Sequence, residues 1–92
     1  MVVMRLDENS VREHLRGLDG WDRQGDRIRK TYTFADFRGS IAFVGAVAEL
    51  AEELDHHPDI TVSYATVTLT LSTHDAGGLS ERDFELARRI DA

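Results

Sequence analysis

Two adjacent histidines, His56 and His57, stand in the tract LAEELDHHPDI, between a run of carboxylates and the only proline of the chain. Imidazole changes its charge near neutral pH, so a histidine can donate or accept a proton during a reaction. Glu52 and Asp55 precede the pair, and both nearby carboxylates and the C-terminal end of a helix favour a protonated imidazole. These residue types, at this spacing, predict a site for general acid or base catalysis.

A third histidine, His74, lies in the tract LSTHDAGGLSERD, where a predicted strand runs into a glycine-rich loop. Binding residues often lie at the ends of secondary-structure elements, so His74 is a candidate for the same site. A single histidine at a helix end is more often a capping or solvated residue, and His14 is interpreted in that way. Three histidines thus remain as candidates for chemistry.

Other chemistries have weaker support. Glu52 and His56 lie four residues apart on one helical face and both are metal ligands, but adjacent histidines point about 100° apart on a helix and the HExxH spacing is absent. A metal site is therefore not expected. The chain has no cysteine, and neither Ser72 nor Ser80 stands in a nucleophile elbow. The Gly77–Gly78 pair is interpreted as a turn into a capped helix, with a phosphate cradle as a weaker alternative.

The composition limits the class of protein. Ninety-two residues allow one hydrophobic core and not two, so residues 1–92 are predicted to form a single domain. The formal net charge of -6 opposes binding to nucleic acid, and the basic RIRK tract is interpreted as a solvated strand face. The first residues are too polar for a signal peptide or a membrane span, so we expect a cytoplasmic protein without membrane contact.

Three segments show the periodicity of amphipathic helices. They cover residues 11–18, 36–55 and 81–90. Ser10 and Glu13 have the spacing of a capping box, and Ser80 and Asp83 repeat this spacing before the last helix. The long central helix is expected to end near Asp55, because a proline follows and disfavours helical backbone before it.

Between these helices, alternating apolar and polar residues predict two antiparallel hairpins. The first turns at Gly25–Asp26, and Ile28, Tyr32 and Phe34 share its buried face. The second turns near Ala65–Thr66. The element order is therefore α-β-β-α-β-β-α, which predicts an α+β fold with one four-stranded antiparallel sheet covered by helices on one face.

The tract ELDHHPDITVSYATVTLTLSTHDAGGLSERD resembles the signature of the pterin-4a-carbinolamine dehydratase family. The matching positions are, in order, Glu52, His56, His57, Pro58, Tyr64, His74 and Asp83. The upstream tract GWDRQGDRIRKTYTFADF is similar to the same family, so the resemblance covers the chain from Leu15 onward. It implies a four-stranded antiparallel sheet with three helices on one face, assembled into homodimers or homotetramers.

The resemblance also implies an activity. Members of the family remove water from a 4a-hydroxytetrahydropterin and yield a quinonoid dihydropterin, a step in tetrahydrobiopterin recycling. The implied partners are a small-molecule pterin and an aromatic amino acid hydroxylase of the same pathway, and no metal or organic cofactor is implied. The alternative is a non-catalytic protein-binding module, either a dimerisation cofactor or an assembly scaffold, because some relatives have such roles.

The catalytic residues implied by the resemblance are the three histidines. His56 and His74 are expected to act as general acid and base, and His57 to bind and orient the pterin ring. Ile60 departs from the family pattern, because many relatives have a tryptophan there. That departure puts pterin stacking at this edge of the site in doubt.

Five further residues are implied as substrate-binding residues. Glu52 and Asp55 would hold the histidine tautomers or raise the basicity of the rings. Tyr64 would line the pocket. Arg82, together with Asp83, would close the rim of the pocket through hydrogen bonds.

Overall fold

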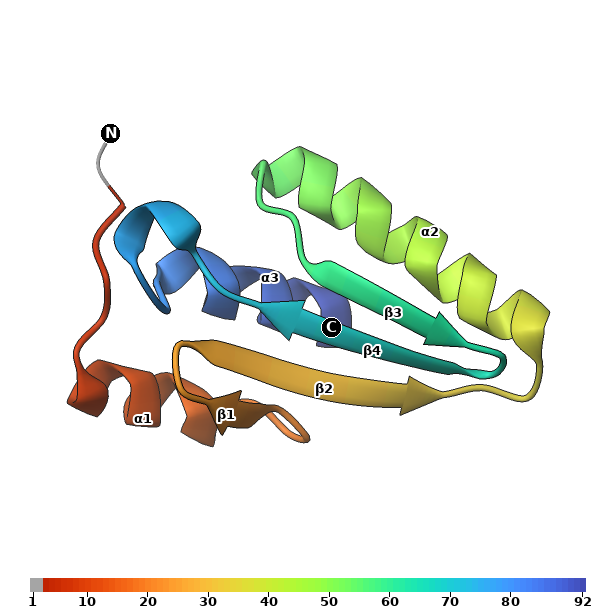
Figure 1. Ribbon diagram of the computed structural model, residues 1–92, viewed down its shortest axis with the longest axis horizontal. Helices are drawn as coiled ribbons and strands as arrows, with labels where there is room; N and C mark the ends of the chain where they lie inside the picture. The colour runs from red at the N-terminus through yellow and green to blue at the C-terminus, as the bar shows by residue number, and fades with distance from the viewer. Residues whose placement is uncertain (1–2) are drawn as a thin grey trace.

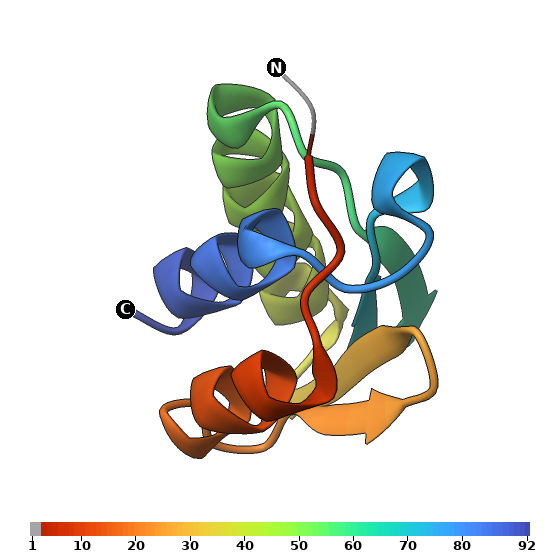
Figure 2. The same ribbon diagram turned by 90° about the vertical axis from the view of Figure 1, so that its left-hand side faces the viewer.

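The computed structural model describes residues 3–92, and its elements confirm the predicted order α-β-β-α-β-β-α. The helices are α1 (Glu8–Arg16), α2 (Phe37–Leu54) and α3 (Glu81–Asp91), and the strands are β1 (Asp22–Gln24), β2 (Arg27–Thr33), β3 (Asp59–Ser63) and β4 (Thr66–Leu71). A turn of 3-10 helix, η1 (His74–Ala76), follows β4 and was not predicted. The strands form one antiparallel sheet in the order β1-β2-β4-β3, and the three α-helices lie on one face of it (Figure 1, Figure 2).

The capping residues explain where two of the helices begin. The helix α1 begins directly after Asp7, because the Asp7 side chain accepts a hydrogen bond of 2.8 Å from the backbone N–H of Ser10. The predicted capping box of Ser10 and Glu13 is therefore wrong, since Ser10 already lies in the first turn. The other prediction is confirmed, because Ser80 caps α3 in a capping box with Asp83.

The hydrophobic core lies between the sheet and the helices. Alternate residues of β4 are buried, and Val67, Leu69 and Leu71 are fully so. They belong to one cluster with Ile28 of β2 and Phe84 of α3, which are also fully buried. Val11 of α1 and Val47 of α2 belong to the same cluster, so each α-helix contributes apolar side chains to it. None of the helices within residues 3–92 is both long and apolar enough to cross a membrane.

The predicted buried face of the first hairpin is buried to different degrees. Ile28 is fully buried as predicted, whereas Tyr32 and Phe34 are half-buried. Both of these rings pack on Phe43 of α2, with centroid distances of 4.5 Å and 5.1 Å. At this end of the sheet the covering helix is α2 (Figure 1), which buries these two rings only in part.

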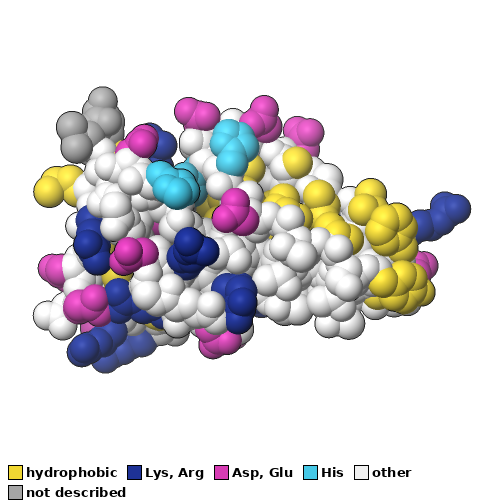
Figure 3. All heavy atoms as spheres, viewed as in Figure 1, with side chains coloured by type: hydrophobic (Ala, Val, Ile, Leu, Met, Phe, Trp, Pro, Cys, Tyr) yellow, Lys and Arg dark blue, Asp and Glu magenta, His cyan; other side chains and the backbone are white. Residues whose placement is uncertain are grey.

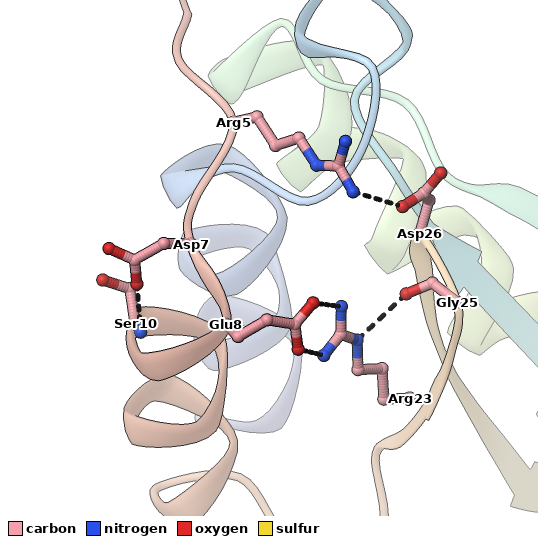
Figure 4. A network of polar contacts seen from close by, with 7 residues as sticks. All are labelled: Arg5, Asp7, Glu8, Ser10, Arg23, Gly25 and Asp26. Carbon is pink, nitrogen blue, oxygen red and sulfur yellow. Dashed lines mark hydrogen bonds and ion pairs between the residues drawn. The ribbon is translucent and has the colours of Figure 1, made fainter.

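The segment before α1 packs beside the loop that contains η1 (Figure 4). Two ion pairs join this segment and the start of α1 to the first hairpin, one between Arg5 and Asp26 and one between Glu8 and Arg23. The N–H of Leu6 donates a hydrogen bond of 2.8 Å to the carbonyl of Leu79. A side chain at Gly78 would place its Cβ 2.9 Å from Nε of Arg5, so the close approach needs a glycine there unless Arg5 moves.

The end of α3 is attached to the first hairpin by a single carboxylate. Asp91 accepts hydrogen bonds from the hydroxyl of Tyr32 at 2.6 Å, from Nε1 of Trp21 at 2.8 Å and from Nζ of Lys30 at 3.0 Å. Trp21 is itself buried, so its indole N–H needs this acceptor. We call these four residues the Asp91 network.

Candidate active site

A cleft of ≈ 240 Å³ lies where the end of α2 meets the end of β4, the turn η1 and the start of α3. Its lining residues are Asp55, His56, His57, Ser72, Thr73, His74, Asp75 and Arg82. The three histidines that the sequence singled out therefore line the same cleft. Figure 3 shows exposed histidine side chains close together on this face, beside acidic and basic side chains.

The pairing of β3 with β4 brings the histidines together. Asp59, at the start of β3, lies opposite Thr70 near the end of β4. Because the two strands are antiparallel, the residues that precede β3 and those that follow β4 emerge at the same end of the sheet. His57 and His74 meet in space for this reason, although they are distant in sequence.

The backbone at the end of α2 gives the adjacent histidines different surroundings. Asp55 ends the helix in the left-handed conformation, with φ of 50°. The N–H of His56 donates to the carbonyl of Ala51 at 3.0 Å, and the N–H of Asp55 donates to that of Glu52 at 3.2 Å. These bonds form a Schellman motif, which turns the chain back toward the core. His56 is consequently 9% exposed, whereas the side chain of His57 is 57% exposed.

His56 lies over a buried carboxylate, that of Asp83 in the first turn of α3. Nε2 of His56 and Oδ1 of Asp83 are 2.6 Å apart, and Asp83 is fully buried. Oδ2 of Asp83 accepts hydrogen bonds from the hydroxyl of Thr73 at 2.8 Å and from the backbone N–H of Ser80 at 3.0 Å. A carboxylate in this position holds the imidazole in one orientation and stabilises positive charge that develops on it.

His57 forms its hydrogen bond at the surface. Its Nε2 is bonded to Oε2 of Glu52, and the Glu52 side chain is 75% exposed. Such a solvated pair contributes little to the free energy of unfolding. It leaves one edge of the His57 ring open to a molecule in the cleft.

His74 lies on a short closed loop above the cleft. Two backbone hydrogen bonds close this loop, from the N–H of Thr73 to Gly78 at 2.9 Å and from the N–H of Gly78 back to Thr73 at 3.3 Å. Gly77 has φ of 72°, a conformation that glycine adopts without strain. The loop thus presents His74 as an exposed side chain on a constrained backbone.

Three of the predicted substrate-binding residues lie at the cleft or beside it, and a fourth lies deeper than expected. Arg82 and Asp55 line the cleft, and Glu52 is bonded to one of its histidines. Asp83 was expected at the rim, but it lies beneath His56 instead. The physical reason is the capping box, which turns the Asp83 side chain back toward the start of its own helix.

Tyr64 and Ile60 lie outside the cleft of this chain. Tyr64 is in the turn between β3 and β4, at the opposite end of these strands from the histidines, and is 69% exposed (Figure 1). Ile60 is half-buried and packs against the hydrophobic core. Within a single chain, neither side chain is placed to touch a molecule bound between His57 and His74.

Thr73 is a cleft residue that the sequence did not single out. A usable signal was present, because the buried positions Val67, Leu69 and Leu71 alternate along β4 and the next position of that series is Thr73. A hydroxyl on the buried side of a sheet needs a hydrogen-bond partner. That requirement pointed to a polar group beneath the strand end, which the structure shows to be Asp83.

The groups around the cleft suit the transfer of protons to and from a small polar molecule. Three imidazoles face it, and Arg82 and Asp55 supply a cation and an anion for hydrogen bonds. In the part of the chain that the structure describes, no three His, Asp or Glu side chains are grouped closely enough to hold a metal ion.

Comparison with known sequences relates the chain to one family. The family model described as pterin 4 alpha carbinolamine dehydratase matches residues 4–92. A relative from Thermomicrobium roseum that carries the family's name is 54% identical over 88 residues, which cover 96% of this chain and 95% of the relative. Another, from Sulfolobus acidocaldarius, is 44% identical over 88 residues, covering 96% of this chain and 97% of the relative.

Two solved structures are similar to the chain. The crystal structure of a transcriptional coactivator/pterin dehydratase from Brucella melitensis matches with a TM-score of 0.91 and 38% identity, covering 95% of each chain. A pterin dehydratase-like protein identified as a RuBisCO assembly factor in the alpha-carboxysome matches with a TM-score of 0.63 and 28% identity, covering 77% of this chain and 82% of that one. The match over residues 4–92 and the shared fold together show that this chain belongs to the pterin 4 alpha carbinolamine dehydratase family.

Proposed function

We propose that this protein catalyses the removal of water from 4a-hydroxytetrahydropterin, giving a quinonoid dihydropterin in the recycling of tetrahydrobiopterin. The observation that carries the proposal is that His56, His57 and His74 line one cleft and that His56 is backed by a buried carboxylate. An aromatic amino acid hydroxylase would supply the substrate, because such enzymes generate the 4a-hydroxyl group.

The reaction needs two proton transfers. Hydroxide is a poor leaving group, so the hydroxyl on C4a must receive a proton as the C4a–O bond breaks and water departs. The neighbouring N5 must lose its proton, and the electron pair of the N5–H bond then forms the N5=C4a double bond. Groups that titrate near neutral pH can serve both transfers, which is why histidines suit this chemistry.

The surroundings of the histidines support different roles for them. His56 and His74 would exchange the two protons, His56 from a fixed and buried position and His74 from the loop above the cleft. The more exposed His57 would bind and orient the pterin ring, held in turn by Glu52. Arg82 and Asp55 would bind the polar edge of the pterin.

A rate measurement on histidine variants tests this function. The 4a-hydroxytetrahydropterin is generated with a hydroxylase, and formation of the quinonoid dihydropterin is followed by stopped-flow absorbance. The wild-type protein should accelerate dehydration, and His56→Ala and His74→Ala should each lower the rate constant by about 100-fold, the typical contribution of one positioned acid or base. Asn9→Ala, an exposed change on α1, is the matched control and should keep the wild-type rate. Full activity in both histidine variants would rule the mechanism out.

We also propose that the protein is a homodimer or homotetramer. Exposed apolar side chains lie at the start of α2 and around β3, namely Phe37, Ile41, Val62 and Tyr64. Figure 3 shows apolar side chains gathered at the end of the molecule away from the histidines. Association of copies would cover them. Tyr64 could contact a pterin only in such an assembly, as a residue contributed to the cleft of another subunit. Sedimentation of the wild-type protein tests whether the assembly forms.

A second candidate function is a protein-binding module, which the names of the two similar structures favour: one is called a transcriptional coactivator/pterin dehydratase and the other a RuBisCO assembly factor. The same exposed apolar side chains would then contact a different protein. The stopped-flow measurement separates a non-catalytic binding module from the dehydratase, because such a module would leave the dehydration rate at its uncatalysed value.

A further inference from the structure

A chain of buried polar groups leads from the start of α3 to His56. Ser80 and Asp83 are fully buried and Thr73 is 5% exposed. The hydroxyl oxygens of Ser80 and Thr73 are 2.7 Å apart, and Oγ1 of Thr73 is 2.8 Å from Oδ2 of Asp83. Oδ1 of Asp83 is 2.6 Å from Nε2 of His56, which completes the chain.

The carboxylate decides which atom donates in each of these bonds. Asp83 lies in the first turn of α3, where the helix dipole favours negative charge, and an ionised carboxylate can only accept hydrogen bonds. The Thr73 hydroxyl must therefore donate to Asp83, and it accepts from the hydroxyl of Ser80. By the same reasoning Nε2 of His56 carries a hydrogen and donates it to Asp83.

This assignment leaves Nδ1 as the ring nitrogen of His56 that can face the substrate. Nε2 is engaged by Asp83, and Nδ1 makes no hydrogen bond to any side chain or backbone group within residues 3–92. In the same residues no buried side-chain nitrogen or oxygen lacks a partner. Nδ1 must therefore be reached from the cleft, which His56 lines.

We propose that Thr73 is a positioning residue for proton transfer, whose hydroxyl holds Asp83 so that Nε2 of His56 stays protonated and Nδ1 exchanges the proton with the pterin. The inference rests on the proposed dehydratase function. The proton that Nδ1 carries either leaves with the C4a hydroxyl as water or arrives from N5. If the carboxylate lost its bond to Thr73, it could rotate away from Nε2, and the imidazole would populate the other tautomer with Nδ1 protonated.

Substitution of Thr73 by valine and by serine distinguishes a positioning role from a role in filling space. Thr73→Val keeps the shape of the side chain and removes only the hydroxyl, whereas Thr73→Ser keeps the hydroxyl and removes a methyl group. A residue needed only to fill space would tolerate valine better than serine. A residue needed for its hydrogen bond to Asp83 would tolerate serine better than valine.

The test combines the stopped-flow rate with the imidazole ¹⁵N NMR spectrum, in which His56→Ala identifies the signals of His56. Thr73→Val should lower the rate constant for dehydration by about tenfold, the loss expected for one hydrogen bond to a charged group, and leave KM within about twofold. Its His56 signals should shift toward the tautomer protonated at Nδ1. Thr73→Ser should keep both the rate and the Nε2-protonated tautomer.

Two results would overturn the inference: an unchanged His56 tautomer in Thr73→Val, or an equal loss of rate in the valine and serine variants. If Thr73→Val fails to fold, as judged by circular dichroism, Thr73→Ala removes the same hydroxyl and takes its place in both measurements. If the wild-type protein does not accelerate dehydration, the proposed function fails, and the NMR spectrum still decides whether Thr73 sets the tautomer of His56.

Discussion

Neighbouring residues of the same type have different surroundings in this cleft. His56 and His57 are identical in chemistry, but one is bonded to a buried carboxylate and the other to an exposed one. A buried carboxylate must have its hydrogen-bonding capacity satisfied, as the Thr73 hydroxyl and the Ser80 N–H do for Asp83. The energetic consequences of removing the two carboxylates should differ accordingly.

Asp83→Ala should lower the free energy of unfolding by about 3 kcal/mol, because it leaves buried donors of Thr73, Ser80 and His56 without an acceptor. Glu52→Ala should change it by less than about 0.5 kcal/mol, because both members of that pair are exposed to water. Urea unfolding followed by circular dichroism measures both values. Equal destabilisation by the two variants would contradict the prediction that the buried Asp83 carboxylate contributes more to the free energy of unfolding than the exposed Glu52 carboxylate.

At the scale of elements, the site depends on how α2 ends. The Schellman motif at Asp55 reverses the chain and inserts His56 beside α3. The motif needs a residue with positive φ, and aspartate tolerates that conformation less well than glycine does. Aspartate at this position supplies a carboxylate to the cleft, which glycine would not.

Asp55→Gly should therefore be more stable than Asp55→Ala by about 1 kcal/mol, because only alanine has a Cβ that opposes the left-handed conformation. Thermal and urea unfolding of the two variants give the difference. As a comparison, Glu53→Gly should be less stable than Glu53→Ala, since Glu53 has ordinary helical backbone. The same sign at both positions would contradict the role assigned to Asp55.

At the scale of the whole molecule, the Asp91 network joins the end of α3, the last helix, to β2 and the residue before β1. Burial alone would raise the pKa of the Asp91 carboxyl, but hydrogen bonds from Tyr32, Trp21 and Lys30 outweigh burial and lower it below its ordinary value of 3.8. A group whose pKa is lower in the folded state stabilises that state above its unfolded pKa. This stabilisation is lost as the pH falls through the folded pKa.

The wild-type protein should accordingly be more stable than Asp91→Asn at pH 6, by roughly 1–2 kcal/mol, the contribution of hydrogen bonds to a charged group. The difference should shrink as the pH falls below about 4, where Asp91 of the unfolded chain begins to bind protons, and should be lost as the pH passes through the lower pKa of the folded state. Urea unfolding at a series of pH values measures it. Asp22→Asn, an exposed position on β1, is the control and should follow the wild-type curve. A difference in the free energy of unfolding that does not depend on pH would show that titration of Asp91 is not its cause.

Much of the fold was predictable because its signals are local. The periodicity of α2, the alternation of β4 and the Ser80 capping box each depend on residues a few positions apart, and all three agree with the structure. The start of α1 was not predicted correctly. Two acceptors, Asp7 and Ser10, stood near the N-terminus of that helix, and a local pattern does not rank them.

By itself, the sequence determined which elements form, their order, and which histidine tracts lie at their ends. Only the tertiary structure decided that His56 is buried and His57 exposed, and that Asp83 lies beneath His56. These facts depend on how the ends of α2 and β4 meet the first turn of α3 around Asp83. Such contacts join segments that are distant in the sequence, and burial and hydrogen bonds across them have no local sequence signature.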